Sequence, residues 1–385
     1  MQYRVNPKTG DKISALGFGC MRFNRSEKEV EQHIRFAIDQ GINYFDTAYL
    51  YPNSEAILGR ILAKDGLRDK VKVATKLPYY LVKSYSDFDK YFNTQLKRLQ
   101  TDHIDYYLMH MLPDYASFES AVNMGILKWA EEKKQTGAIK NFGFSFHGLQ
   151  DEFMKLVDAY SWDFCMIQYN YLDEFVQAGK AGLEYAAKKG LGIMVMEPLR
   201  GGTLVDKLPQ SAKDMWENAP TKRSPADWGL RWVLNHPQVT CVLSGMGTQA
   251  MVEENIATVS DATAHSLSKE ELALYDKVRT EIREATKVGC TGCGYCMPCP
   301  RDVDIPNCFA SLNDTVIKGK MMSMYWYMQM TKGHEASLCV KCGKCEPLCP
   351  QSIPIREKLD QAQRELEGFP YKPMRWFIKT FMNKG

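Results

Sequence analysis

The sequence has little net charge and no long apolar run, and both absences narrow the classes of protein it can represent. Its 49 Lys and Arg residues nearly balance 46 Asp and Glu residues, leaving a formal net charge of +3. Such a balance provides no strong electrostatic field for nucleic acid. No run approaches the ~18 apolar residues that span a bilayer, and residues 1–8 lack the apolar core of a secretory signal. We therefore expect no nucleic-acid partner, no transmembrane segment and a cytoplasmic location.

Cysteine, in contrast, is abundant, and eight of the twelve cysteines fall in two blocks near the C-terminus. The second block has the pattern C-x2-C-x2-C-x3-C-P and consists of Cys339, Cys342, Cys345 and Cys349. This is the ferredoxin-type run, in which three closely spaced thiolates hold one [4Fe–4S] cluster and the fourth reaches another cluster. The first block has a last gap that is one residue shorter, and it consists of Cys290, Cys293, Cys296 and Cys299.

The residues after the two blocks also match, since 299–305 resembles 349–355, which indicates two copies of one unit. Disulfides would require an oxidising compartment, and a chain of 385 residues has little need of them. Zinc sites usually separate their C-x2-C pairs by a longer loop. We therefore expect two [4Fe–4S] clusters. The short gap leaves the fourth ligand of the first block open, with Cys308 as the substitute if Cys299 cannot reach.

Residues 1–285 alternate short apolar strands with amphipathic helices. Strands are predicted at 16–19, 44–48, 71–75, 104–109, 139–144, 164–168, 192–196 and 241–244. Helices are predicted at 26–38, 54–63, 86–99, 118–134, 151–159 and 177–189, with one more opened by Ser224-Pro225. Eight parallel strands joined by helices predict an α/β fold, the (β/α)8 TIM barrel. A doubly wound sheet would need G-x-G-x-x-G after its first strand, and residues 17–22 lack that pattern. Residues 286–385 are expected to form a second, ferredoxin-like domain.

In such a barrel the chemistry lies at the C-terminal ends of the strands. Asp46, Lys76 and His110 end the second, third and fourth strands, and Tyr51 follows Asp46 closely. Each residue taken singly could be an ordinary buried polar group. Together they predict a proton-transfer site, because Lys76 paired with Asp46 would stay charged and lower the pKa of Tyr51. The phenol would then donate a proton near neutral pH.

These residues also carry a family resemblance, over residues 1 to about 285. The segment Tyr44-Phe-Asp46-Thr-Ala-Tyr-Leu-Tyr51-Pro-Asn-Ser-Glu55, with Lys76 in Val-Ala-Thr-Lys and His110 in Tyr-Tyr-Leu-Met-His, resembles the aldo-keto reductases. The resemblance places the family's catalytic tetrad on Asp46, Tyr51, Lys76 and His110, and Tyr49 is not the acid. It implies hydride transfer between a nicotinamide cofactor, NADP(H) or NAD(H), and a small-molecule carbonyl or alcohol. The cysteine-rich tail is similar to that of the subgroup fused to a ferredoxin-like domain.

The same resemblance implies a set of cofactor contacts at the ends of the remaining strands and in the loops after them. They fall on Gly19, Cys20, Ser145, Gln168, Pro198, Leu199, Gly201, Ser244, Gly245, Glu254 and Asn255. Two departures from the family pattern stand out. Phe146 and then His147 follow Ser145 where the family commonly has Asn, and Gly245 and Met251 stand where basic residues usually hold a 2′-phosphate. The choice between NADP and NAD is therefore not determined by the sequence, and a flavin stays possible.

The roughly 40 residues between the cysteine blocks include a predicted helix, which favours an α-helical ferredoxin. The ligand sets would then be crossed. Cys290, Cys293 and Cys296 would share a cluster with Cys349, and Cys339, Cys342 and Cys345 would share one with Cys299. The clusters could be redox-active or structural. Two alternative functions stay open: an electron-transfer protein that links the clusters to a flavin or a redox partner protein, and a non-catalytic redox-sensing barrel.

Overall fold

The computed structural model describes residues 1–23, 26–317 and 319–377 of the chain. They form two compact units, and each unit is built from two stretches of chain. The first unit comprises Met1–Arg200 and Arg223–Glu271, and the second comprises Gly201–Lys222 and the chain from Leu272 onward. The domain limits 1–285 and 286–385 stay a prediction. Within the described ranges, no helix combines the length and the apolarity that crossing a membrane requires.

The first unit is a closed barrel of eight parallel strands, in the order β10-β3-β4-β5-β6-β7-β8-β9. This confirms the predicted fold class. Neighbouring strands pair in parallel, as where Phe45 lies opposite Val73, and the β6–β7 pairing shifts its register between Met109 and Leu112. Most strand residues are buried, which explains the short apolar runs in the sequence. The strands are β3 (Leu16–Gly19), β4 (Tyr44–Asp46), β5 (Lys72–Leu77), β6 (Ile104–Leu112), β7 (Ile139–Phe146), β8 (Phe164–Gln168), β9 (Gly192–Met196) and β10 (Cys241–Ser244).

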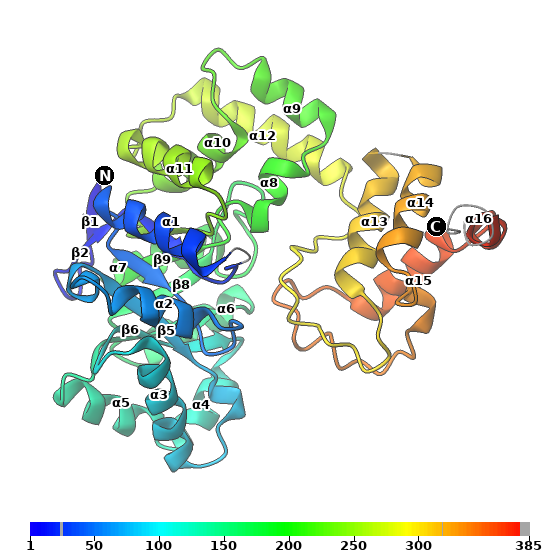
Figure 1. The fold of residues 1–385 in the computed structure, drawn as a ribbon. Coiled ribbons are helices and arrows are strands. Elements are labelled where there is room, and N and C mark those ends of the chain that lie inside the picture. Colours follow the sequence, from blue (N-terminus) through cyan, green and yellow to red (C-terminus); the bar gives the residue numbers. More distant parts are fainter. Residues whose placement is uncertain (24–25, 318, 378–385) are drawn as a thin grey trace. The chain divides into compact units, whose positions relative to one another are not determined.

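Helices surround these strands (Figure 1). They are α1 (Glu27–Asp39), α2 (Ser54–Leu62), α3 (Tyr85–Leu99), α4 (Tyr115–Asn123), α5 (Ile126–Gln135), α6 (Gln150–Ala159), α7 (Gly179–Lys188), α10 (Pro225–Leu234) and α11 (Gln249–Asp261), with 3-10 turns η1 (Leu67–Lys70) and η2 (Tyr79–Leu81). The capping box of Ser26 and Glu29 begins α1 as predicted. The single helix predicted at 118–134 is wrong, because Gly125 adopts φ 97° and separates α4 from α5.

The N-terminal end of the barrel is closed. A two-stranded hairpin, β1 (Tyr3–Val5) with β2 (Lys12–Ser14), pairs Tyr3 with Ser14 and brings Ile13 into the apolar core of the barrel. The Tyr106 hydroxyl donates to Asp11 Oδ2 at 2.7 Å, and Lys72 pairs with Asp11 Oδ1 at 2.8 Å. These contacts fill the N-terminal end of the barrel. In barrels of this kind the chemistry takes place at the opposite, C-terminal end of the strands.

The second unit is helical. Its helices are α8 (Thr203–Asp206), α9 (Gln210–Glu217), most of α12 (Lys269–Glu284), α13 (Ile305–Ile317), α14 (Lys320–Met330), α15 (Ile355–Leu366) and α16 (Tyr371–Phe377), with the 3-10 turns η3 (Arg200–Gly202), at the unit boundary, and η4 (Ala336–Leu338). Helices α13, α14 and α15 share one apolar core, which includes Phe309, Leu312, Met324, Tyr327 and Leu359. Cysteines of both blocks pack against this core from the loops before α13 and α15.

Candidate functional site

The four residues of the predicted tetrad lie together at the C-terminal end of the barrel. The Lys76 ammonium donates to Asp46 Oδ1 at 2.6 Å and to the Thr47 carbonyl oxygen at 2.8 Å. Its Nζ lies 5.0 Å from the centre of the Tyr51 ring. The Tyr51 and His110 rings meet edge-on, with centroids 6.1 Å apart. The strand ends thus bring an acid, an amine, a phenol and an imidazole into one group.

Burial sets the electrostatics of this group. Asp46 and Lys76 are 5% and 1% exposed. Burial raises the pKa of the Asp46 carboxyl, and the adjacent Lys76 opposes that rise. Burial also lowers the pKa of His110 well below its usual value, and the charge of Lys76 adds to this effect. His110 is therefore a neutral imidazole at pH 7, which can donate one hydrogen bond without carrying a charge.

A buried polar network supports the backbone that carries Lys76. Glu55 is 1% exposed, and its Oε1 accepts hydrogen bonds from Thr75 at 2.6 Å and from Gln95 at 2.7 Å. The same Gln95 amide donates to the backbone oxygen of Lys76 at 3.1 Å. Arg98 pairs with Glu55 Oε2 at 3.0 Å, which satisfies the second carboxylate oxygen. The backbone that carries Lys76 is thus fixed by side chains from α2 and α3.

Tyr49 belongs to a different environment from Tyr51. The Arg98 guanidinium lies 4.4 Å from the centre of the Tyr49 ring, and the Tyr91 ring meets it edge-on at 5.1 Å. Arg98 also donates to the Tyr49 carbonyl oxygen at 3.2 Å. Tyr49 is therefore packed against α3, whereas the Tyr51 ring contacts Lys76 and His110.

Some of the positions that were predicted to contact a cofactor lie at the same end of the barrel. Gly19 and Ser244 end neighbouring strands, and a Cβ on Gly19 would lie 3.3 Å from the Ser244 backbone. The Asn255 amide donates to Ser244 Oγ at 2.9 Å. After Ser244, the turn stays open, because a Cβ on Gly247 would meet no heavy atom within 4 Å. Helix α11 follows this turn, and Thr248 Oγ accepts from the Met251 N–H at 3.3 Å. The start of a helix favours an anion.

Other predicted contact residues are already engaged with protein groups. Ser145 Oγ accepts from the Met111 N–H at 2.8 Å, and the Cys20 thiol is buried and donates to the Phe18 oxygen at 3.5 Å. Leu199 packs closely against Gly229, because a Cβ added to Gly229 would lie only 2.4 Å from Leu199 Cδ2. The remaining positions differ in setting: Pro198 is buried, Gly245 and Glu254 are exposed, and Gly201 has φ 65° and belongs to the second unit.

Three further residues at this end of the barrel are His147, Gln177 and Glu197, and the sequence did not assign a role in the site to His147 or Gln177. His147 follows β7, and burial lowers its pKa to about 4, with Lys76 adding to the effect. Gln177 has φ 58° and its side chain bonds to both His147 and Gln168. Glu197 follows β9 with φ 55°, and burial raises its pKa to about 7. Strained backbone of the kind found at Gln177 and Glu197 is typical of functional sites.

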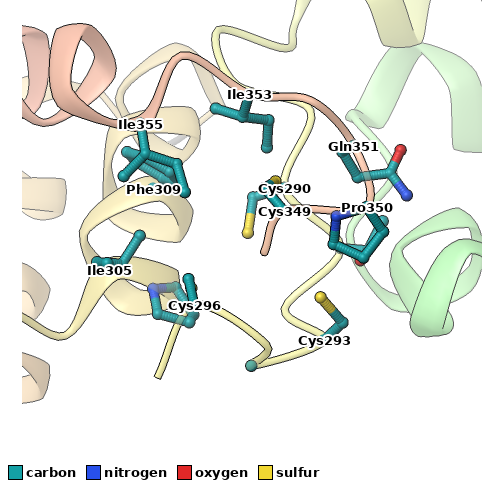
Figure 2. A pocket seen from close by; sticks show the side chains of 13 residues that line it. Cys290, Cys293, Cys296, Ile305, Phe309, Cys349, Pro350, Gln351, Ile353 and Ile355 are labelled. Atoms are coloured by element: carbon teal, nitrogen blue, oxygen red, sulfur yellow. The ribbon is translucent and has the colours of Figure 1, made fainter. Parts of the chain in front are cut away.

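In the second unit, four cysteines line one hollow (Figure 2). Cys290, Cys293 and Cys296 come from the first block, and Cys349 comes from the second. Apolar side chains complete the lining and include Ile305, Phe309, Ile353 and Ile355. Burial raises the pKa of the Cys296 thiol to about 12, and Cys293, Cys290 and Cys349 add to the rise. Four clustered thiols of this kind need the positive charge of a metal group to exist as thiolates.

The second block shows the corresponding arrangement. Burial raises the pKa of the Cys345 thiol, and the nearby Glu346, Cys339 and Cys299 contribute to the rise. In each block, the sulfur of the first cysteine accepts from the backbone N–H of the residue two positions later. The Gly292 N–H donates to Cys290 and the Lys341 N–H donates to Cys339, both at 3.4 Å. This repeats the local geometry of one block in the other. Cys342 is the exposed member of its block.

Cys308 is not among the four cysteines that line the hollow. It is fully buried on α13, and its sulfur lies 3.9 Å from the Tyr327 hydroxyl. In the described part of the chain, no three His, Cys, Asp or Glu side chains gather as the ligands of a single metal ion. The hollow, with four cysteines and an apolar lining, fits a [4Fe–4S] cluster better than a tetrahedral zinc.

Comparison with known proteins matches both parts of the chain. Residues 15–280 match the model of the aldo/keto reductase family, and residues 289–354 match the 4Fe-4S dicluster domain. The chain is 26% identical to L-galactose dehydrogenase of Arabidopsis thaliana, over 74% of this chain and 97% of that protein. It is 25% identical to L-glyceraldehyde 3-phosphate reductase of Escherichia coli, over 72% of this chain and 92% of that protein.

A solved structure agrees with the fold. The holo form of aldo-keto reductase AKR11C1 from Bacillus halodurans aligns with a TM-score of 0.61 and 26% identity, covering 72% of this chain and 96% of that one. The match to the family model extends over most of the chain and includes all eight barrel strands. The chain therefore belongs to the aldo/keto reductase family of oxidoreductases and carries a 4Fe-4S dicluster domain after its barrel.

Proposed function

We propose that the barrel interconverts a small-molecule carbonyl and an alcohol by hydride transfer, with Tyr51 as the proton donor. The observation that carries this proposal is the buried pair of Lys76 and Asp46 beside the Tyr51 ring. Asp46 orients Lys76, and the ammonium stabilises negative charge on the phenol oxygen after the proton has left. Each turnover in the reductive direction adds one hydride to the carbonyl carbon and one proton to its oxygen.

His110 has a separate role in this proposal. Its burial keeps the ring neutral at pH 7, so it can donate a hydrogen bond to the carbonyl oxygen without competing as an acid. A donor held at the oxygen stabilises the negative charge that develops there in the transition state. Tyr51 then supplies the proton, and Lys76 and Asp46 keep their positions throughout.

A nicotinamide cofactor, NADP(H) or NAD(H), supplies the hydride in this proposal when it is bound. The residues present fit such a group, since the open turn at Gly245–Gly247 precedes the N-terminus of α11. This turn would hold the phosphates, with Gly19 allowing close approach and Asn255 supporting Ser244. Ser145 and Gln168 would lie against the nicotinamide. The names of the two relatives, a dehydrogenase and a reductase, support both directions of the reaction.

For the second unit, we infer that eight cysteines hold two [4Fe–4S] clusters with crossed ligands. The hollow that brings Cys349 beside Cys290, Cys293 and Cys296 supports the first set. The proximity of Cys299 and Cys339 to Cys345 supports the second set, to which Cys342 belongs. Each cluster moves one electron at a time, so coupling to a two-electron hydride requires a flavin or a redox partner protein. Thiolate ligands suit a reducing compartment, and we place the protein in the cytoplasm.

The direct test of this function is an anaerobic assay of the purified protein with NADPH or NADH and a panel of aldehydes and ketones. Oxidation of the nicotinamide that depends on the carbonyl compound and yields the alcohol supports hydride transfer at the barrel. Absence of such turnover, together with reduction of the clusters by NAD(P)H, would favour electron transfer instead.

A further inference from the structure

Four side chains form a hydrogen-bonded row at the C-terminal end of the barrel, beside the tetrad. His147 Nδ1 lies 3.1 Å from Gln177 Oε1, and Gln177 Nε2 donates to Gln168 Oε1. Gln168 Nε2 in turn donates to Asp173 Oδ2 at 2.9 Å. We call these four residues, His147, Gln177, Gln168 and Asp173, the polar row. It joins the ends of β7 and β8 to the loop between β8 and α7.

The polar row has a fixed direction, and Asp173 sets it. Arg200 Nε lies 2.9 Å from Asp173 Oδ2, and Asn170 donates to the same oxygen at 3.1 Å. A carboxylate held by a guanidinium only accepts hydrogen bonds, so Gln168 must turn its NH₂ group toward Asp173. Its carbonyl oxygen then faces Gln177 and must accept, which turns the oxygen of Gln177 toward His147.

This direction fixes the tautomer of His147. An amide oxygen only accepts hydrogen bonds, so the proton of the ring lies on Nδ1, facing Gln177. Nε2, on the far side of the ring, is then a bare acceptor. Burial lowers the pKa of His147 to about 4, so the ring is neutral across the physiological range. His147 thus carries one acceptor atom whose state the rest of the row determines.

His147 is also placed beside the reacting groups. It directly follows β7, and its backbone N–H donates to the Leu112 oxygen at the end of β6, at 3.1 Å. It lies close enough to the tetrad that the charge of Lys76 acts on its ring and that its own ring acts on His110. Leu112 lies two residues after His110 on β6, so His147 adjoins the strand end that carries His110.

We propose that His147 is a specificity-determining residue, whose Nε2 accepts a hydrogen bond from a hydroxyl on the carbon next to the reacting carbonyl. This rests on the proposed hydride transfer at the tetrad. A bare nitrogen acceptor attracts a hydroxyl and repels a carbonyl or carboxylate oxygen, so the favoured substrates are 2-hydroxy aldehydes and ketones. When a substrate without the hydroxyl covers Nε2, the acceptor is shut off from water and has no partner, which is the situation in which polar sites discriminate most strongly.

The test compares 2-hydroxypropanal with propanal, which differ by one hydroxyl, under the same nicotinamide cofactor. We expect the native protein to favour 2-hydroxypropanal by roughly 10- to 100-fold in kcat/KM, the weight of one buried hydrogen bond to a substrate. His147→Phe removes the acceptor and should bring the ratio of the two kcat/KM values to within about 3-fold of one. His147→Gln, which restores an acceptor, should recover part of the ratio.

Gln177→Leu tests the row itself, because it releases the tautomer of His147 without touching that ring. The ratio should fall several-fold in Gln177→Leu, and this variant also serves if His147→Phe does not fold. His33→Gln, on α1 of the first unit, is the matched control and should keep the native ratio.

The outcomes separate the two proposals. If the native protein reduces no aldehyde or ketone of the panel with NADPH or NADH, hydride transfer is overturned, and this inference with it. If it reduces others of the panel but neither of these two aldehydes, or reduces both equally well, only this inference is overturned. If both aldehydes are reduced and the ratio survives in both His147→Phe and Gln177→Leu, only the role of His147 is overturned. A raised KM for the nicotinamide cofactor with an unchanged ratio would assign His147 to the cofactor, which also overturns this inference.

Discussion

Lys76 Nζ lies 2.6 Å from Asp46 Oδ1, and both side chains are almost completely buried. Removing one partner of a buried ion pair leaves the other without compensation, which typically costs about 3–5 kcal/mol of stability. The cost depends on whether the remaining group can become neutral. Burial already raises the pKa of Asp46, so this carboxyl can take up a proton when Lys76 is absent.

We therefore predict that Lys76→Met abolishes measurable turnover. The difference in thermal stability between the variant and the native protein should also be more favourable to the variant at pH 5 than at pH 7. Without Lys76 the folded-state pKa of Asp46 rises further above its unfolded value, so the folded state binds more protons and gains stability as the pH falls. Thermal unfolding of both proteins at the two pH values measures this. An unchanged difference between pH 7 and pH 5 would show that Asp46 stays ionised or solvated in the variant.

A second pH dependence follows from His147, with the opposite sign. Its folded-state pKa is about 4 and its ordinary value is 6.5, so the unfolded state binds the proton first as the pH falls. Stability is therefore lost between about pH 6.5 and pH 4. His147→Phe lacks this contribution and should lose less of its melting temperature between pH 7 and pH 5 than the native protein does. His110 contributes in the same direction in both proteins, so only the difference between them reports on His147.

The strand ends explain why much of the site could be predicted from the sequence. In a parallel barrel all strands end at one rim, so Asp46, Lys76 and His110 meet there once the strands are recognised. The fold class follows from the same alternation of strands and helices and is confirmed by the closed barrel. The roles of these residues stay a prediction, because geometry alone does not measure proton transfer.

The polar row could not be predicted in the same way. Gln177 and His147 are 30 residues apart, and their contact depends on an irregular loop and on the positive φ of Gln177. No periodic pattern encodes such a contact. The position of Cys308, in contrast, had a usable signal. Ile305, Cys308 and Leu312 recur at helical spacing and are all buried on α13, which marks Cys308 as a core residue.

The clusters give a third prediction. Anaerobically purified protein should contain about eight iron and eight sulfide per chain, corresponding to two cubanes. Its broad visible absorption should bleach on addition of dithionite. Elemental analysis that finds zinc, or only half of this iron after full reconstitution, would remove the two-cluster assignment.

The crossed ligand sets give a fourth prediction, because they determine which single-cysteine variants lose the same cluster. Cys349→Ser should lose the same cluster as Cys293→Ser, although the two residues belong to different blocks. Cys299→Ser should correspondingly resemble Cys345→Ser. Electron paramagnetic resonance of the reduced variants identifies the cluster that remains in each. Pairing of Cys349→Ser with Cys345→Ser would show that each block holds its own cluster. Cys308→Ser is the control, and it should keep both clusters.

The last prediction concerns the two tyrosines that follow β4. Tyr51 lies against Lys76 and His110, whereas Arg98 and Tyr91 hold the ring of Tyr49. Tyr51→Phe removes one hydroxyl, so the fold and nicotinamide binding should survive while kcat falls by roughly 10²–10⁴-fold, the usual weight of general-acid catalysis. Tyr49→Phe is the matched control, and it should change kcat by less than about 3-fold, because its hydroxyl has no part in the proposed proton transfer.

Steady-state rates, together with nicotinamide binding measured by fluorescence, distinguish the possible results. Loss of kcat with retained binding in Tyr51→Phe places the proton donor at Tyr51. Loss of kcat in Tyr49→Phe alone would move the acid to Tyr49, against the packing of its ring on α3. Unchanged turnover in both variants would mean that the reaction does not use a tyrosine at this strand end, and the clusters would then have to carry the redox chemistry.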